Sequence, residues 1–233
     1  LTVRAGRIPT LKIEPSISEV QLLNKEFTIN VTINNLDEVW HAVGIQFRLC
    51  YDDTLLEVVN VTEGPFMKDS RWNLHGTFFQ VYVETHPIYG PQVLVGIMLY
   101  PNETGFWNAF PEGSGVIASI TFRAIKQERG LEKPPLTCHL TLNDTIIIDD
   151  KSEEIVHTIK HGLYMMYPTH IGDFNYDGKV DIRDIAGIAS AFGSYPGHER
   201  WDPVYDTNND ERIDIKDIAI AARGFGWVPS VDP

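Results

Sequence analysis

Apolar and polar residues alternate in short segments from residue 10 to about residue 166, and this pattern predicts β-strands. The segments are rich in β-branched and aromatic residues, and Gly, Pro, Asn and Asp separate them. The expected strands are residues 10–14, 27–33, 42–51, 55–61, 77–84, 92–99, 115–125, 136–142 and 162–166. Many short strands joined by turns favour a mainly β protein, an antiparallel sandwich of two sheets.

The pattern changes after residue 170, where two segments with helical periodicity form an internal repeat. They are residues 182–192 and 215–225, and sliding the region along itself by 33 positions superposes them. At this offset Asp173 aligns with Asp206, and the alignment continues to the glycine that follows each helical segment. Two copies are too few for a solenoid, so we expect a small duplicated loop–helix unit.

These patterns divide the chain into five parts. They are an N-terminal extension (1–9), a β-sandwich (10–166), a short linker (167–170), the duplicated unit (171–227) and a C-terminal tail (228–233). Residues 10–14 are expected to be the first strand of the sandwich itself. Residues 1–8 could instead add a strand to the sheet of a neighbouring molecule.

Each helical segment follows a loop in which Asp or Asn occupies alternating positions. Calcium binds six to eight oxygen atoms, and EF-hand-type loops supply them from positions 1, 3, 5, 7, 9 and 12. These positions hold Asp173, Asn175, Asp177, the Lys179 carbonyl, Asp181 and Asp184 in the first loop, and Asp206, Asn208, Asp210, the Arg212 carbonyl, Asp214 and Asp217 in the second. We therefore expect two Ca²⁺ sites, and the alternative is a solvated acidic surface.

The second loop departs from the pattern at position 6, where Glu211 replaces the glycine found at position 178 of the first loop. A non-glycine residue at positive φ costs roughly 1–2 kcal/mol. The second site is therefore expected to be the weaker one. Val180 and Ile213, at position 8 of the two loops, are expected to pair with each other through a short β-bridge.

Charge and motifs exclude several classes of function. The 233 residues carry a net charge of −13, which disfavours binding to nucleic-acid phosphates and to anionic membrane surfaces. No apolar run is long enough to cross a bilayer. The sequence has no nucleophile elbow, zinc-protease motif, P-loop or dinucleotide-binding turn, so we expect a protein that is not an enzyme.

Four Asn-x-Thr sequons indicate a secreted protein, because chance would supply only about one. They are Asn30, Asn60, Asn102 and Asn143, and each lies on an outward-facing strand position, at a strand end or in a loop. We expect N-glycosylation at these residues, and coincidence is the alternative.

The two cysteines lie on opposite faces of their expected strands. Cys50 has the outward parity of its strand, whereas Cys138 shares the inward parity of Leu140 and Leu142. Side chains on opposite faces cannot be bridged without moving the backbone. Two separate thiols are therefore favoured over a disulfide.

The two acidic loops, each followed by one helix with no helix before the loop, resemble a type I-like dockerin module over residues 171–227. A full EF-hand would have helices on both sides of its loop. The resemblance implies partner binding through the residues just after each loop start, commonly a Ser-Thr pair. Those positions here hold Ile182 and Arg183, and Ile215 and Lys216. The two isoleucines are either exposed anchors or residues packed between the helices.

Residues 10–166 resemble a cohesin, the partner module of dockerins. The resemblance is carried by residues 27–61, which include the run "FRLCYDDTLLEV", and by residues 115–125 and 140–166. It implies a nine-stranded jelly-roll sandwich that uses one sheet face to grip a dockerin. On that face we expect Gln46, Arg48, Tyr82, Met98 and His139, which have outward parity on four strands.

The short linker suggests how two such modules in one chain are used. About five residues reach under ~20 Å when extended, and Pro168 stiffens them. The dockerin-like unit is therefore not expected to reach the cohesin-like face of its own chain. We expect a calcium-dependent extracellular scaffolding protein that binds copies of itself, or another cohesin- or dockerin-bearing protein. Head-to-tail contacts of this kind propagate into a cell-surface assembly or filament.

The alternative function is carbohydrate binding by a surface module that the dockerin-like unit anchors. Aromatic rings in or near expected loops could stack on sugars, with polysaccharide as the ligand. They are Trp40, Trp72, Tyr89, Phe106 and Trp107. Packing of these rings in the core or at its rim is the other explanation.

Overall fold

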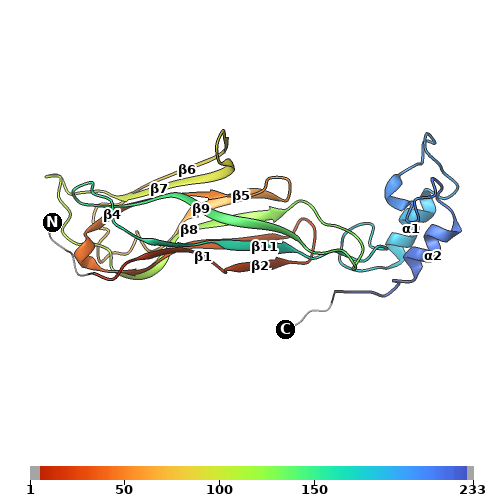
Figure 1. Ribbon diagram of the computed structural model, residues 1–233, viewed down its shortest axis with the longest axis horizontal. Coiled ribbons are helices and arrows are strands. Elements are labelled where there is room, and N and C mark those ends of the chain that lie inside the picture. The colour runs from red at the N-terminus through yellow and green to blue at the C-terminus, as the bar shows by residue number, and fades with distance from the viewer. Residues whose placement is uncertain (1–5, 230–233) are drawn as a thin grey trace. The chain divides into compact units, whose positions relative to one another are not determined.

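The computed structural model describes residues 6–229, which form two β-sheets followed by two short α-helices (Figure 1). One sheet contains, in spatial order, β10 (Thr158–Lys160), β1 (Thr10–Glu14), β3 (Glu26–Leu36), β8 (Gly113–Ala124) and β5 (Leu56–Glu63). The other contains β2 (Ile17–Val20), β11 (Gly162–Met166), β9 (Leu136–Asp149), β4 (Ala42–Cys50), β7 (Gly90–Leu99) and β6 (Thr77–His86). The fold is a mainly β sandwich, as the alternating pattern predicts.

The inward residues of both sheets make the sandwich core. Phe27 of β3 stacks on Tyr164 of β11 with ring centroids 5.2 Å apart, so the two sheets are in contact there. Phe122 of β8 contacts Tyr51, which follows β4, at the same centroid distance. Aromatic pairs of this kind add to the burial of apolar area that stabilises the sandwich.

All nine expected strands are present, but the described residues contain eleven. The two additional strands are β2 and β10. β2 has only four residues, and β10 has three exposed residues that pair in parallel with β1 at the edge of the sheet. Strands this short carry too few alternating positions to be found by periodicity. The nine-stranded expectation is therefore wrong in number, although the sandwich itself is correct.

The N-terminal region is only partly covered by the structure. The strand expected at residues 10–14 is confirmed as β1, which pairs antiparallel with β3. Residues 6–9 form no regular element, and the Arg7 carbonyl accepts a hydrogen bond of 2.8 Å from the Trp40 indole. The possibility that residues 1–8 add a strand to a neighbour remains a prediction, and residues 1–5 lie outside the described residues.

Both cysteines are free and buried. The Asn143 amide donates to Cys50 Sγ at 3.3 Å, and the Asp52 main-chain nitrogen donates to Cys138 Sγ at 3.2 Å. Burial raises the pKa of the Cys138 thiol. The interpretation as two separate thiols is confirmed, and the disulfide alternative is wrong, because the two side chains lie on opposite faces of their strands.

The described chain forms two compact units. The first contains residues up to 18, 26–123 and 137–164, and the second contains 19–25, 124–136 and the residues from 165 onward. The second unit includes α1 (Ile182–Ser190) and α2 (Ile215–Ala222). Its helical core contains Phe174, Ile188, Ala191, Ile213 and Ala221. No helix within residues 6–229 has the length and apolarity needed to cross a bilayer.

Candidate functional site

The first acidic loop, residues 173–184, is coiled so that its buried carboxylates accept main-chain hydrogen bonds. Asp173 Oδ1 accepts from the nitrogen of Asp177 at 3.2 Å, and its Oδ2 accepts from the nitrogen of Gly178 at 3.1 Å. Asp184 Oδ1 accepts from the nitrogen of Phe174 at 2.9 Å. The first and last positions of the loop are thereby held close together by the main chain between them.

The second acidic loop, residues 206–217, repeats this arrangement residue by residue. Asp206 accepts from the nitrogens of Asp210 and Glu211 at 3.1 and 3.0 Å. Asp217 Oδ1 accepts from the nitrogen of Thr207 at 2.9 Å. The repeat of 33 residues in the sequence is therefore a repeat in local structure.

Positions 3, 5 and 7 complete each loop. Asn175 Oδ1 accepts from the nitrogen of Asp177 at 2.9 Å, and Asn208 Oδ1 accepts from the nitrogen of Asp210 at 3.0 Å. Position 7, the proposed carbonyl ligand, is Lys179 in one loop and Arg212 in the other.

Positions 9 and 12 have a second role, because they start the helices. Asp181 caps α1, and its Oδ1 accepts from the nitrogen of Arg183 at 2.7 Å. Asp184 completes a capping box with Asp181, and Asp214 and Asp217 form the same box at α2. Each box satisfies main-chain donors that the first turn of a helix leaves free. The aspartates at the end of each loop therefore also form the start of the helix that follows it.

The end positions of the loops bury negative charge without a cationic partner. The most enclosed carboxylates of the two loops are those of Asp173, Asp184, Asp206 and Asp217, each at most 9 % exposed. Burial is the main cause that raises the pKa of Asp173, and the charges of Asp184 and Asp177 add to it. None of the four forms an ion pair with another residue in the described part of the chain. Buried carboxylates of this kind fit a bound cation.

No group of three or more His, Cys, Asp or Glu side chains within residues 6–229 is arranged to hold a metal ion. Each expected ligand set contains four aspartates, an asparagine and a main-chain carbonyl, and in this structure aspartates of the first set accept main-chain hydrogen bonds. The carboxylates of Asp181 and Asp214 also face the helix nitrogens that they cap. The twelve calcium ligands therefore stay a prediction, supported by the donor set and its burial.

Position 6 of both loops adopts positive φ. Gly178 has φ 82° and Glu211 has φ 62°. The strained conformation expected for Glu211 is present, and its nitrogen still bonds to Asp206.

Replacing Glu211 by glycine is expected to stabilise the duplicated unit by about 1 kcal/mol, because glycine adopts positive φ without a steric penalty. Gly178→Ala should destabilise it, because Gly178 has φ 82° and an added Cβ would also displace Leu22 Cδ2. Urea unfolding followed by circular dichroism measures both. An unchanged free energy of unfolding in Glu211→Gly would show that backbone strain at position 6 is unimportant.

The bridge expected between Val180 and Ile213 is wrong. The nitrogen of Val180 donates to Trp227 at 3.0 Å and its carbonyl accepts from Gly226, whereas Ile213 makes the equivalent pair of bonds with Gly193 and Ser194. Each loop is therefore closed by the segment that follows the helix of the other copy. Gly193 and Gly226 have φ 81° and 86°, a conformation that lets the chain leave the helix toward the opposite loop.

The positions that the dockerin resemblance singled out are on the surface. Ile182 and Ile215 are 66 % and 65 % exposed, so the alternative that they pack between the helices is wrong. Arg183 and Lys216 follow them, and Lys216 Nζ lies 3.0 Å from Asp210 Oδ2. Phe192 and Phe225, which also match in the repeat, are exposed and were not selected from the sequence. Their equivalence in the repeat was the signal that could have found them.

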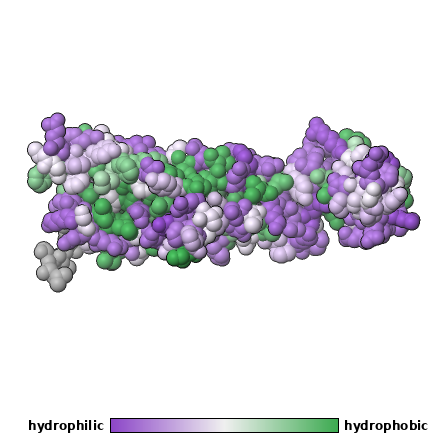
Figure 2. All heavy atoms as spheres, turned by 90° about the horizontal axis from the view of Figure 1, so that it is seen from above, coloured by the Kyte–Doolittle hydropathy of each residue, from purple (hydrophilic) through white to green (hydrophobic). Residues whose placement is uncertain are grey.

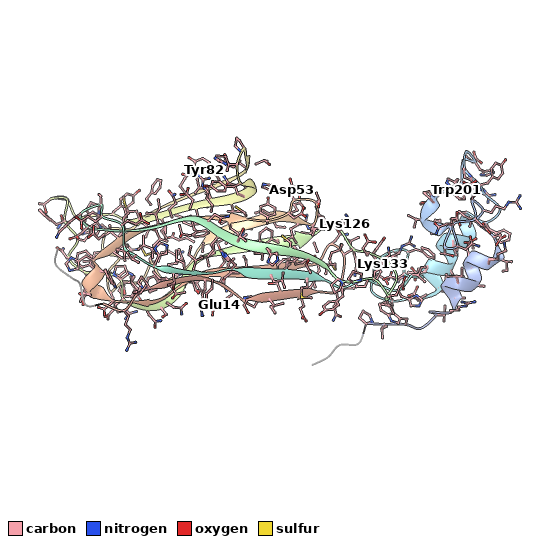
Figure 3. The ribbon with its side chains drawn as sticks, viewed as in Figure 1. Glu14, Asp53, Tyr82, Lys126, Lys133 and Trp201 are labelled. Atoms are coloured by element: carbon pink, nitrogen blue, oxygen red, sulfur yellow. The ribbon has the colours of Figure 1, made fainter. Side chains whose placement is uncertain are left out.

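The five residues expected on the cohesin-like face all belong to the six-stranded sheet. Tyr82 of β6, Leu94 of β7 and Arg48 of β4 are neighbours across three strands, and Tyr82 projects from β6 (Figure 3). Gln46 is the cross-strand partner of Gly96 on β7. Met98 has the same parity as Gly96, and His139 is exposed on β9. The strands therefore bring these residues to one sheet face.

The centre of this face is an apolar groove that the sequence reasoning did not identify. We call it the sheet-face groove; its lining includes Gly44, Gln46, Phe78, Gly96, Met98, Ile146 and Ile148. Glycines at two central positions lower the surface between the larger side chains. Apolar residues gather on the visible face of the sandwich in Figure 2. The outward parity of Phe78 and the glycines was the available signal.

Most of the aromatic residues considered for sugar binding form hydrogen bonds within the fold. Trp72 is buried, and its indole donates to the Phe66 carbonyl at 2.9 Å. The Trp40 and Trp107 indoles donate to the carbonyls of Arg7 and Leu99. Phe106 and Tyr89 remain exposed. The packing explanation therefore holds for the three tryptophans.

The sequon asparagines have different surroundings. Asn60 is exposed on β5, whereas Asn102 Oδ1 accepts from Thr104 and Phe106 within its turn. Asn30 accepts from the Ser119 hydroxyl at 2.7 Å, and Asn143 lies beside Arg48 on the sheet face. Glycosylation of the four residues stays a prediction.

Comparison with known proteins identifies the sandwich. The cohesin domain family matches residues 21–160, more than half of the chain, and the match ends before the duplicated unit. A chain of a type I cohesin–dockerin complex from Clostridium thermocellum is similar at 13 % identity and TM-score 0.53, over 70 % of this chain and 97 % of that one.

Two further solved structures are similar to this chain. CaCohA2 of Clostridium acetobutylicum is similar at 16 % identity and TM-score 0.50, over 70 % of this chain and 92 % of that one. A non-cellulosomal cohesin of the archaeon Archaeoglobus fulgidus is similar at 21 % identity and TM-score 0.48, over 69 % and 91 %. No curated protein matches the sequence. The chain belongs to the cohesin domain family.

Proposed function

We propose that this protein is a non-catalytic, calcium-dependent scaffolding protein that associates head to tail. The sheet face of one copy binds the helix starts of the duplicated unit in the next. The observation that carries the proposal is the presence of complementary surfaces in one chain. One is an apolar sheet-face groove in a cohesin-family sandwich, and the other is a pair of exposed isoleucines at equivalent positions of a repeat.

Calcium is proposed to be held by the ligands expected in the two acidic loops, with Asp173 and Asp184 closing the first and Asp206 and Asp217 the second. When bound, the ion neutralises the buried carboxylates. The chain itself holds the ligands in register through the main-chain bonds to these four residues. Asp184 and Asp217 also complete the capping boxes that start α1 and α2, so calcium binding would fix the surface that carries Ile182 and Ile215.

The linker supports contact between molecules. Its main chain is hydrogen-bonded within the second compact unit: the nitrogen of Tyr167 donates to Val20 at 3.1 Å, and the Gln127 amide donates to the Tyr167 carbonyl at 2.8 Å. These bonds on the linker favour a partner surface on another molecule over the sheet face of the same chain. The resulting contact is heterologous and propagates into a filament unless it closes into a ring.

An extracellular location is part of the proposal, and the four sequons and the cohesin family of the sandwich support it. The partner is then another copy of this chain or another secreted protein with a cohesin or dockerin module. Polysaccharide binding is the second candidate, and the exposed Phe106 and Tyr89 are the residues that favour it.

Sedimentation velocity of the full chain in calcium and in EGTA tests the proposal. We expect association that increases with protein concentration in calcium and monomers in EGTA. Monomers in both conditions would contradict self-association. Retardation in polysaccharide gels that persists in EGTA would favour the carbohydrate-binding alternative.

A further inference from the structure

The two acidic loops differ in what surrounds them, although their internal geometry is the same. The first loop contacts residues 19–25, residues 124–136 and Thr169, which we call the joint. These segments belong to the same compact unit as both loops. Lys126 and Lys133 are the labelled residues of segment 124–136 in Figure 3. Three contacts connect the joint to the first loop, and the second loop has no counterpart of them among the described residues.

The first contact is made by Thr169. Its hydroxyl donates to Asp173 Oδ2, the first position of the first loop. Its main chain is paired with segment 124–136, because its nitrogen donates to Glu128 at 2.9 Å and its carbonyl accepts from Gly130 at 2.9 Å. The repeat equivalent of Thr169 is Asp202, whose carboxylate instead accepts from the nitrogen of Val204. Thr169 thus forms hydrogen bonds both to Asp173, a proposed calcium ligand, and to segment 124–136.

The second contact is made by Arg129. Its Nη2 donates to the Val204 carbonyl at 2.9 Å, and its guanidinium lies 5.0 Å from the ring centroid of Phe174. Phe174 is position 2 of the first loop and part of the helical core. Its repeat equivalent is Thr207, which offers no aromatic ring. A partly buried guanidinium over an aromatic ring is a stabilising contact, so the position of Phe174 matters to the joint.

The third contact is made by Leu22. A Cβ added to Gly178 would lie 2.3 Å from Leu22 Cδ2, so residue 22 lies directly against position 6 of the first loop. The equivalent Glu211 is exposed. Position 6 therefore has less free space in the first loop than in the second.

We propose that calcium in the first loop, and not in the second, fixes the duplicated unit onto the joint. This inference rests on the proposed calcium binding and adds a regulatory role to one site. An ion in the first loop orders Asp173 and Phe174, the two residues that Thr169 and Arg129 hold. Because coupling between two equilibria is reciprocal, breaking the Thr169 contact weakens calcium binding at the first loop and leaves the second loop unchanged.

Thr169→Val tests the coupling, and Thr207→Val is the matched control. Thr207 Oγ1 lies 3.1 Å from Asp217 Oδ1, so the control removes an equivalent hydroxyl–carboxylate bond in the second loop without touching the joint. Calorimetric titration of the full chain with CaCl₂ should show about tenfold weaker binding at one site in either variant, because each loses a hydrogen bond to a charged group.

Hydrogen exchange then separates the two variants. Calcium should slow exchange in residues 19–25 and 124–136 of the wild-type protein and of Thr207→Val. That protection should be reduced in Thr169→Val and in Arg129→Met, and Thr169→Ser should restore it. Calcium binding without a change in exchange of these segments, or equal protection in Thr169→Val and Thr207→Val, would overturn the inference alone. A titration without any calcium binding would overturn the proposed function as well.

Discussion

Replacing Asp184 and Asp217 together by alanine is expected to unfold the duplicated unit and to leave the β-sandwich folded. Each carboxylate is at most 1 % exposed and accepts main-chain bonds from both ends of its loop. Hydrogen bonds to charged groups contribute about 1.5–3 kcal/mol each. The five buried residues of the helical core cannot offset the loss of several of them. Calcium would add about 2.7 kcal/mol per site at a hundredfold excess over Kd, and the variant forfeits this contribution.

Circular dichroism during heating measures this effect. The wild-type protein in calcium should show helical signal that is lost on unfolding of the duplicated unit, and the double variant should lack that signal. Glu103→Ala with Glu199→Ala is the matched control, because it removes two exposed carboxylates outside both loops. A double loop variant with unchanged helical signal would contradict the structural role of position 12.

Gly96→Arg is expected to weaken self-association by at least a hundredfold without destabilising the monomer. A Cβ at residue 96 would meet no atom within 4 Å, so the fold tolerates a side chain there. Glycine also weakens a strand interior, so the substitution does not cost strand stability. The new side chain would project over the sheet-face groove between Gln46 and Gln80, and would put an unpaired charge into the proposed interface.

Sedimentation velocity in calcium measures the association, and thermal melting measures the monomer. Thr121→Arg is the control, because it places the same side chain on β8 of the other sheet. Loss of association in Thr121→Arg but not in Gly96→Arg would assign the contact to the opposite sheet.

The alternating pattern located the sandwich because one face of each long strand is buried. Phe47 and Phe122, for example, are fully buried and lie within regular alternation. The same parity placed Cys50 and Cys138 on opposite faces and brought Gln46, Arg48 and Tyr82 to one sheet. The acidic loops could also be found from the sequence, since the spacing of their Asp and Asn residues follows from the geometry of a chain coiled around an ion.

Other features depend on contacts between distant segments, and local sequence carries little information about them. β10 exists because the sandwich places three exposed residues beside β1. The bonds of Val180 and Ile213 go to the segments after the opposite helices, so the equivalence of the two residues wrongly predicted a direct bridge. The joint at Arg129 is of the same kind, since nothing in its surrounding sequence indicates a contact with Phe174.

Native mass spectrometry of the purified full chain, which counts bound metal ions directly, is the sharpest test of the account. With calcium present, we expect a dominant species with two Ca²⁺ per chain, and one Ca²⁺ when either Asp184→Ala or Asp217→Ala is introduced. A wild-type chain that retains no calcium, or that binds it equally well in both variants, would contradict the central claim that the duplicated loops are calcium sites.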